Sequence, residues 1–186
     1  MPMKLKNLGD YGSGYLSPIL NGHNINAIVS LILPKIKKAK LNFDYIACRG
    51  MSGIVIAVPL AMRLNKGIII VRKDVKGSHG SKIEASPAIK NNIVRYIIVD
   101  DFIDTGKTIK TIKKEVEDVD WIGYGKDDAV KFDLVGVVLY EQTSGLLNEY
   151  IYNSSDAGTK KEWLKRVYPG TTIITGFNLD KEMYGF

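Results

Sequence analysis

The chain has 186 residues, of which 45% are hydrophobic and 25% charged, and these values fit one folded, soluble domain with a single core. Cys48 is the only cysteine, which excludes an intrachain disulfide and fits a reducing cytoplasm. The sequence contains no apolar run of the roughly 18 residues that would span a bilayer, and its start lacks the apolar stretch of a signal peptide. We therefore expect a cytoplasmic protein that does not enter a membrane.

The net charge of +6 suggests an acidic partner, either a nucleic acid or a polyphosphate. The sequence has no zinc-finger spacing, no RNP-type aromatic motif and no basic-region heptad, so we do not expect nucleic acid as the partner. The lysines at 35–40 are typical of the solvated face of a helix. His23 and His79 lie far apart in the sequence, which argues against a structural zinc site.

The first predicted element is a helix over residues 24–40, where Ile25, Ile28, Val29, Ile32 and Ile36 recur at helical spacing. Asn24 has the side chain of an N-cap. Pro34 should bend this helix or end it early, because proline lacks the N–H that the helix requires.

Strands and helices alternate after this segment. Residues 43–48 predict a short buried strand, residues 49–53 a glycine-flanked turn, and residues 54–64 a helix bent near Pro59. Residues 67–71 form a continuous β-branched apolar run, which is typical of a central parallel strand covered on both faces.

Residues 73–92 are polar and lack an apolar period, which is uncommon inside a domain unless the segment is a mobile loop over a binding site. A strand over 96–99, a turn over 100–108, a helix from Ile109 to Val119 and a buried strand over 134–140 follow.

This alternation predicts an α/β fold with a doubly wound, mostly parallel sheet. We expect one domain over residues 1–186. Its core would cover about 24–140, and a small hood would come from 141–186 and possibly from 1–22.

The most informative segment runs from Ile97 to Thr108, where an apolar strand leads into Asp100 and Asp101 and then into a small-residue turn that opens a helix. In a parallel sheet this turn lies at the carboxyl edge, where α/β proteins bind ligands. The first amides of the helix lack intrahelical partners and suit a phosphate, and Gly106 would allow its close approach. The two carboxylates suit sugar hydroxyls or hydrated magnesium. The segment therefore predicts a sugar-phosphate site.

Two other interpretations fit this segment less well. A P-loop ending in Gly106-Lys107-Thr108 would need glycine where this chain has Asp101, and a carboxylate there would repel the phosphates. The aspartates could instead merely cap the strand–helix turn, but a cap needs only one carboxylate and two repel each other.

The segment 98–108 closely resembles the signature of type I phosphoribosyltransferases, which bind 5-phosphoribosyl-1-pyrophosphate (PRPP), and the resemblance extends over about residues 43–140. It implies a phosphoribosyltransferase-like core with a hood. It also implies a magnesium-dependent glycosyltransferase that passes ribose 5-phosphate from PRPP to a nucleobase and releases pyrophosphate. A homodimer is implied as well.

The resemblance assigns roles to particular residues. The ribose and 5-phosphate of PRPP would be bound by Asp100, Asp101, Ile103, Asp104, Thr105, Gly106, Lys107 and Thr108. Magnesium would be held by Asp100 and Asp101, partly through water or ribose hydroxyls. Pyrophosphate would be bound by Arg49, Gly50, Met51, Ser52, Arg72 and Lys73. The mobile loop would act through Lys76, Ser78 and His79.

The base is less determined. The Asp104-Thr105-Gly106 sequence is similar to that of 6-oxopurine enzymes of purine salvage, which act on hypoxanthine, guanine or xanthine, and it makes Asp104 the catalytic candidate. The sequence over 141–144 looks more like an adenine-type enzyme. We expect that Trp163, Tyr168 or Phe177, or Tyr11 or Tyr15, could stack on the base, although each also suits a core position.

The sequence is also compatible with two further functions. One is a transferase for another base, namely adenine, orotate or uracil. The other is a regulator of the same fold that senses PRPP and binds RNA or DNA through a basic face.

Overall fold

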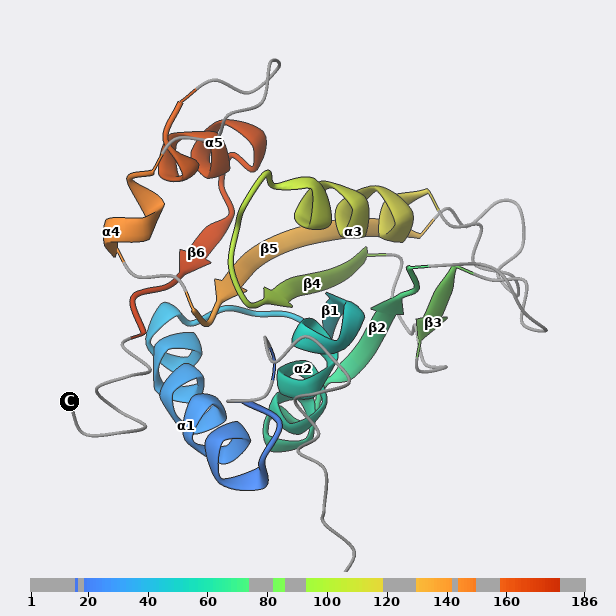
Figure 1. Ribbon diagram of the computed structural model, residues 1–186. Coiled ribbons are helices and arrows are strands. Elements are labelled where there is room, and N and C mark those ends of the chain that lie inside the picture. The colour runs from blue at the N-terminus through green and yellow to red at the C-terminus, as the bar shows by residue number, and fades with distance from the viewer. Residues whose placement is uncertain are drawn as a thin grey trace, which may run out of the picture.

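A six-stranded sheet forms the centre of the molecule (Figure 1). The computed structural model describes residues 16, 19–73, 82–85, 93–118, 130–141, 144–149 and 158–177. The strands lie in the order β3-β2-β1-β4-β5-β6. Their bounds are β1 Tyr45–Arg49, β2 Gly67–Val71, β3 Ile83–Ala85, β4 Ile93–Asp100, β5 Lys131–Leu139 and β6 Thr172–Ile174. All neighbours pair in parallel except β2 and β3, which are antiparallel, so the predicted mostly parallel sheet is confirmed.

Helices cover both faces of the sheet (Figure 1), as a doubly wound fold requires. Their bounds are α1 Gly22–Ala39, α2 Gly50–Leu64, α3 Lys107–Glu117, α4 Ser144–Leu147 and α5 Lys160–Val167. Side chains of β4 alternate between the two resulting cores. Tyr96 and Ile98 join the core under α3 and α5, whereas Ile97 and Val99 join the core under α1 and α2.

Helix α1 begins earlier than predicted and continues through Pro34. Its N-cap is Asn21, whose side chain accepts a hydrogen bond from the amide of Asn24. Pro34 lies inside the helix and does not end it. A proline in a helix interior costs about 3 kcal/mol. Burial of Ile32 and Ile36, each worth roughly 1.5–3 kcal/mol, offsets that cost and keeps the helix intact.

Part of the chain after residue 140 belongs to the core sheet and not to a separate hood. Strand β6 pairs in parallel with β5, with Thr172 opposite Gly136. The ammonium group of Lys35 on α1 donates hydrogen bonds to the carbonyls of Thr175 (2.9 Å) and Gly176 (3.0 Å) just beyond β6. The core therefore extends to the segment around residue 177, beyond the boundary expected at 140.

The predicted loop 73–92 contains a short strand. Residues Ile83–Ala85 pair with β2, and the amide of Arg72 donates to the carbonyl of Lys82 at 2.8 Å. Residues 74–81 and 86–92 lie outside the described residues, so the mobile-loop prediction stays a prediction. Among the described residues, no helix is long and apolar enough to cross a membrane.

Candidate active site

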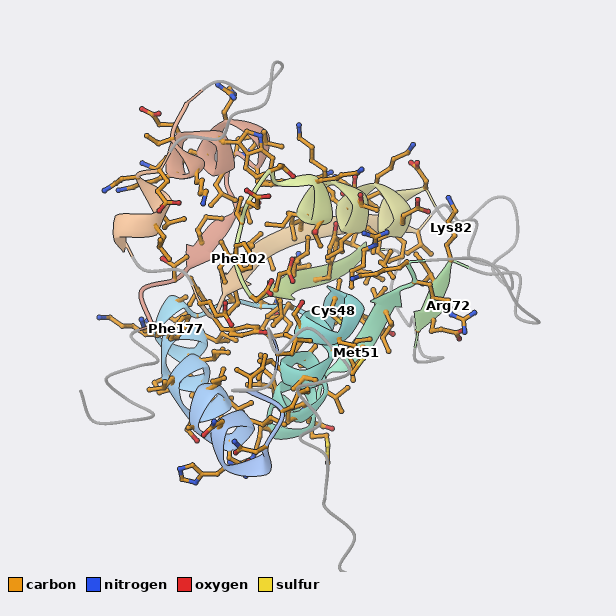
Figure 2. The ribbon with its side chains drawn as sticks, viewed as in Figure 1. Cys48, Met51, Arg72, Lys82, Phe102 and Phe177 are labelled. Carbon is orange, nitrogen blue, oxygen red and sulfur yellow. The ribbon has the colours of Figure 1, made fainter. Side chains whose placement is uncertain are left out.

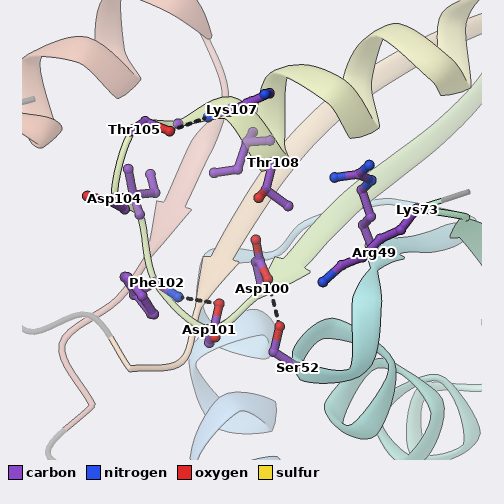
Figure 3. Close-up of a pocket in the computed structure, with 13 residues that line it drawn as sticks. Arg49, Ser52, Lys73, Asp100, Asp101, Phe102, Asp104, Thr105, Lys107 and Thr108 are labelled. Carbon is purple, nitrogen blue, oxygen red and sulfur yellow. Dashed lines mark hydrogen bonds between the residues drawn. The ribbon is translucent and has the colours of Figure 1, made fainter. Parts of the chain in front are cut away.

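A cavity of about 580 Å³ opens at the carboxyl edge of the sheet (Figure 3). It lies where β1, β2 and β4 end and where α3 begins. The residues that line it are Arg49, Ser52, Lys73, Asp100, Asp101, Phe102, Ile103, Asp104, Thr105, Gly106, Lys107, Thr108 and Ile109. The structure thus brings together every residue that was predicted to bind the ribose and 5-phosphate.

The turn between β4 and α3 forms one wall of the cavity. Asp100 ends β4, and α3 begins at Lys107 after Gly106, which takes a left-handed conformation with φ of +73°. Gly106 has no side chain with which to cap the helix, and the hydroxyl of Thr105 accepts only a long bond (3.4 Å) from the amide of Lys107. The positive end of α3 therefore faces the cavity with backbone N–H groups suited to an anion.

The two adjacent aspartates lie at the base of this wall and are both buried. Burial and the neighbouring carboxylate of Asp101 raise the pKa of Asp100 to about 8. A carboxylate oxygen of Asp101 accepts a bond from the amide of Phe102 at 2.9 Å, and the hydroxyl of Ser52 donates to Asp100 at 3.5 Å. Asp100 therefore holds its proton more tightly than a free carboxyl group, and a bound cation would favour its ionised form.

Positive charge lies across the cavity from the aspartates. Arg49 ends β1 and Lys73 follows β2, and because these parallel strands are neighbours their ends meet at one edge. The Nε atom of Arg49 is buried and has no hydrogen-bond partner among the described residues. Figure 3 shows Arg49, Lys73 and Asp100 facing a common space. The arrangement suits a large anion held between the cations and the carboxylates.

Gly50 allows Lys73 to reach this position. Its φ is +71°, and a Cβ atom there would lie 2.7 Å from Cε of Lys73. The structure places Gly50 and Met51 in the first turn of α2, outside the lining of the cavity, and Met51 is exposed. The predicted turn over residues 49–53 is thus largely the start of a helix.

Arg72 was predicted to contact pyrophosphate together with Lys73, but the structure does not bring it to the cavity. Its Nε atom pairs with the carboxylate of Glu84 on β3 at 3.5 Å. Figure 2 shows Arg72 beside β3. The reason is geometric: successive residues of an extended segment point to opposite sides, so Arg72 and Lys73 cannot both face the same space. Lys76, Ser78 and His79 lie outside the described residues.

Asp104 is an exposed residue of the turn that lines the cavity. The capping alternative would have it accept from the amides of Gly106 or Lys107. In the structure the amide of Lys107 donates a hydrogen bond to the hydroxyl of Thr105 instead. The catalytic role of Asp104 stays a prediction.

The aromatic candidates for the base fall elsewhere. Trp163, Tyr168 and Phe177 are buried in the two cores, and Tyr11 and Tyr15 lie outside the described residues. Among the residues that the structure describes, the aromatic side chain that lines the cavity is Phe102, which is 37% exposed and which was not among the predicted base-stacking residues. Its position directly after the paired aspartates is a sequence signal that could have identified it. Ile109, also not selected, adds an apolar surface.

A doubly wound sheet with a cavity of this kind at its carboxyl edge is typical of α/β proteins that bind phosphorylated ligands. Residues 16–121, more than half of the chain, match the phosphoribosyl transferase domain. The chain belongs to this family.

Relatives with curated names match parts of the chain. The orotate phosphoribosyltransferase of Archaeoglobus fulgidus is 33% identical over 82 residues, which cover 44% of this chain and 45% of the relative. The adenine phosphoribosyltransferase of Fervidobacterium nodosum is 36% identical over 91 residues (42% and 53%). The transcriptional regulator GfcR of Methanocaldococcus jannaschii is 28% identical over 103 residues (53% and 49%). The chain thus spans about half the length of these relatives.

Solved structures of the same fold include two transferases. Orotate phosphoribosyltransferase from Francisella tularensis superposes with a TM-score of 0.59 at 15% identity and covers 86% of this chain and 70% of that one. Adenine phosphoribosyltransferase from Thermoanaerobacter pseudethanolicus gives 0.53 at 21% identity (86% and 84%). These likenesses show the type I phosphoribosyltransferase fold.

Proposed function

We propose that the chain transfers ribose 5-phosphate from PRPP to a nucleobase and yields a nucleoside monophosphate and pyrophosphate. The observation that carries this proposal is the two-sided cavity, with backbone amides and paired aspartates on one wall and Arg49 and Lys73 on the other. A sugar that carries a phosphate at one end and a diphosphate at the other matches this distribution of charge. Family membership supports the same activity.

In this reaction the lone pair of a base nitrogen forms a bond to C1′ of PRPP. The bond from C1′ to the pyrophosphate oxygen breaks, and its electrons leave with the pyrophosphate. The turn over residues 101–108 would hold the 5-phosphate, and Asp100 and Asp101 would accept hydrogen bonds from the ribose hydroxyls. Arg49, Ser52 and Lys73 would stabilise the negative charge that develops on the leaving group.

Magnesium fits this donor set. Among the described residues no group of three His, Cys, Asp or Glu side chains is placed to hold a metal, so Asp100 and Asp101 would bind the ion together with substrate oxygens. The raised pKa of Asp100 supports the fit, because a dication would relieve the repulsion between the two carboxylates. Bound magnesium would neutralise charge on the pyrophosphate.

The proposal is tested by PRPP binding. PRPP with magnesium at about 100 times its dissociation constant should raise the free energy of unfolding by roughly 2.7 kcal/mol. Replacing Asp100 and Asp101 together by Asn should remove most of this gain, because both ribose and magnesium contacts are lost. Differential scanning fluorimetry measures the effect. A wild-type melting temperature that does not respond to PRPP would refute the proposed substrate.

The base is proposed from Asp104. A 6-oxopurine that attacks through an imidazole nitrogen must release a proton, and a carboxylate at the cavity wall would accept it. Asp104→Asn should therefore keep PRPP affinity and lose on the order of 10²-fold in kcat with guanine, hypoxanthine or xanthine. Pyrophosphate release with a panel that also includes adenine, orotate and uracil checks this. Turnover with orotate or adenine alone would instead match the transferases named above.

A second candidate is a PRPP-sensing regulator that binds nucleic acid. It is favoured by the similarity to the regulator from Methanocaldococcus jannaschii and by the net charge of +6. The two candidates separate experimentally. A regulator would bind PRPP but would not release pyrophosphate with any base of the panel. It would also slow the migration of DNA or RNA in a gel-shift assay.

A further inference from the structure

Trp163 lies directly behind the glycine of the phosphate-binding turn. A Cβ atom at Gly106 would lie 2.4 Å from Cη2 and 2.5 Å from Cζ2 of this tryptophan, distances that real Cβ contacts do not reach. The six-membered edge of the indole therefore covers the Cα atom of Gly106. Gly106 also lines the cavity, whereas Trp163 does not, so the turn is enclosed between the cavity and the indole ring.

This contact gives a different explanation for the glycine at position 106. The sequence suggested that Gly106 leaves room for a phosphate. The structure shows that the space of the missing side chain is taken by Trp163, and that the φ of +73° independently favours glycine. The indole ring and the left-handed backbone conformation therefore both require glycine at position 106.

Trp163 is itself held firmly. It is fully buried in the core under α3 and α5, and Tyr168 packs edge-on against it with ring centroids 5.6 Å apart. Helix α5, which carries it, starts with a capping box between Thr159 and Glu162. The ammonium group of Lys110, in the first turns of α3, lies 5.4 Å from the centre of the indole ring. The tryptophan thus contacts both the turn and the helix that follows it.

The indole Nε1 is buried without a hydrogen-bond partner among the described residues. A buried N–H without a partner destabilises a fold, and a purely hydrocarbon side chain would avoid that cost. The length of the indole side chain explains its presence here. The atoms nearest to Gly106 belong to the far edge of its six-membered ring.

We propose that Trp163 is a positioning residue for the phosphate-binding turn, which it holds so that the amides at the start of α3 face the cavity. This inference rests on the proposed function, because it assigns the turn to the 5-phosphate of PRPP. It makes a helix of the C-terminal part of the chain a component of the PRPP site.

The test compares three variants by isothermal titration with PRPP and magnesium. Trp163→Ala should raise the dissociation constant about 10-fold, since a turn that is free to shift loses the alignment of its amides. Trp163→Phe should raise it less, because a phenyl ring fills part of the space. Leu164→Ala is the matched control: it empties a buried position next to Trp163 on α5 and should leave the dissociation constant within about twofold of wild type.

Kinetics give a second readout. Trp163→Ala should raise KM for PRPP and leave kcat nearly unchanged, since the residue touches neither the base nor the reacting atoms. A core residue that only supports stability would lower the melting temperature in both alanine variants without this split.

Fluorescence reports the contact in a fully folded protein. The chain has two tryptophans, so Trp121→Phe leaves Trp163 as the only indole. Adding ribose 5-phosphate should change its emission, because the anion binds on the other side of Gly106. This variant keeps the proposal testable even where Trp163→Ala does not fold.

The outcomes separate the two proposals. A wild-type chain that binds neither PRPP nor ribose 5-phosphate overturns the proposed function and this inference with it. A wild-type chain that binds PRPP while Trp163→Ala binds it equally well overturns the inference alone. The same holds if ribose 5-phosphate binds without any change in Trp163 emission.

Discussion

Two strand-to-helix connections meet at the cavity, and they are built in opposite ways. Between β1 and α2 there is no connecting residue: Arg49 ends the strand and Gly50 begins the helix. Between β4 and α3 the chain makes a turn over residues 101–106. Both connections lie at the same edge of the sheet, so their difference is one of local design and not of position.

The different lengths of the two connections determine which groups each wall can offer to an anion. The short connection leaves little backbone facing the cavity, so it offers side chains, above all the guanidinium of Arg49. The long turn offers its backbone amides to the phosphate, so its basic side chains matter less for anion binding. We therefore expect loss of a basic side chain to weaken anion binding strongly at Arg49 and little at Lys107, which follows the turn.

The largest effect should come from Arg49→Ala. A charge-assisted hydrogen bond contributes about 1.5–3 kcal/mol, so the loss of a bidentate guanidinium should lower kcat/KM for PRPP by about 10²-fold. Steady-state kinetics measure it. Arg72→Ala is the matched control, because its side chain pairs with Glu84 outside the cavity and its loss should change kcat/KM little. Equal losses in both variants would show that bulk positive charge matters and not the position of Arg49.

An intermediate effect concerns pH, through Asp100, which accepts a hydrogen bond from the hydroxyl of Ser52 on α2. The pKa of Asp100 is about 8 in the folded chain and about 4 in an unfolded one. Between these values the folded state binds more protons, so the stability of the unliganded protein should fall as the pH rises from about 4 to 8. Thermal melts across this range measure the slope.

Asp100→Asn is the control for this pH dependence, because the amide does not titrate. Its melting temperature should decline less over the same range. An identical decline in both proteins would assign the pH dependence to other groups.

The smallest effect should come from Lys107→Ala. Its side chain is exposed, and the turn is expected to bind phosphate through the amide, which alanine retains. We expect a change of about twofold or less in PRPP affinity, as for other solvent-screened charges. Titration calorimetry beside Arg49→Ala measures the contrast. A loss comparable to that of Arg49→Ala would show that both walls rely on side chains.

The sequence predicted one wall of the site better than the other. Residues 100–108 are consecutive, so strand, acid pair, turn and helix could be recognised together from local rules. The other wall combines Arg49, Ser52 and Lys73 from separate segments. Nothing local distinguishes Arg72 from Lys73, since both are basic and the sheet geometry alone decides which one faces the cavity.

Long-range packing explains most of what the sequence did not predict. Phe43 to Tyr140 was recognised as α/β because alternating apolar runs are a local signal. The pairing of β6 with β5, and the contact of Trp163 with Gly106, join segments that lie far apart in the chain and have no local signal. Pro34 does not end α1 for a related reason, since local propensity ignores the burial that holds this helix together.

The placement of β6 has a consequence for how the chain is synthesised. Until residues 172–174 emerge from the ribosome, one long side of β5 has no neighbour, and β5 ends in a run of buried apolar residues. Exposed strand edges of this kind pair with other chains and promote aggregation. Lys35, made early, binds the carbonyls just after β6. The nascent protein therefore depends on residues 172–176 to cover a surface that the segments before them created.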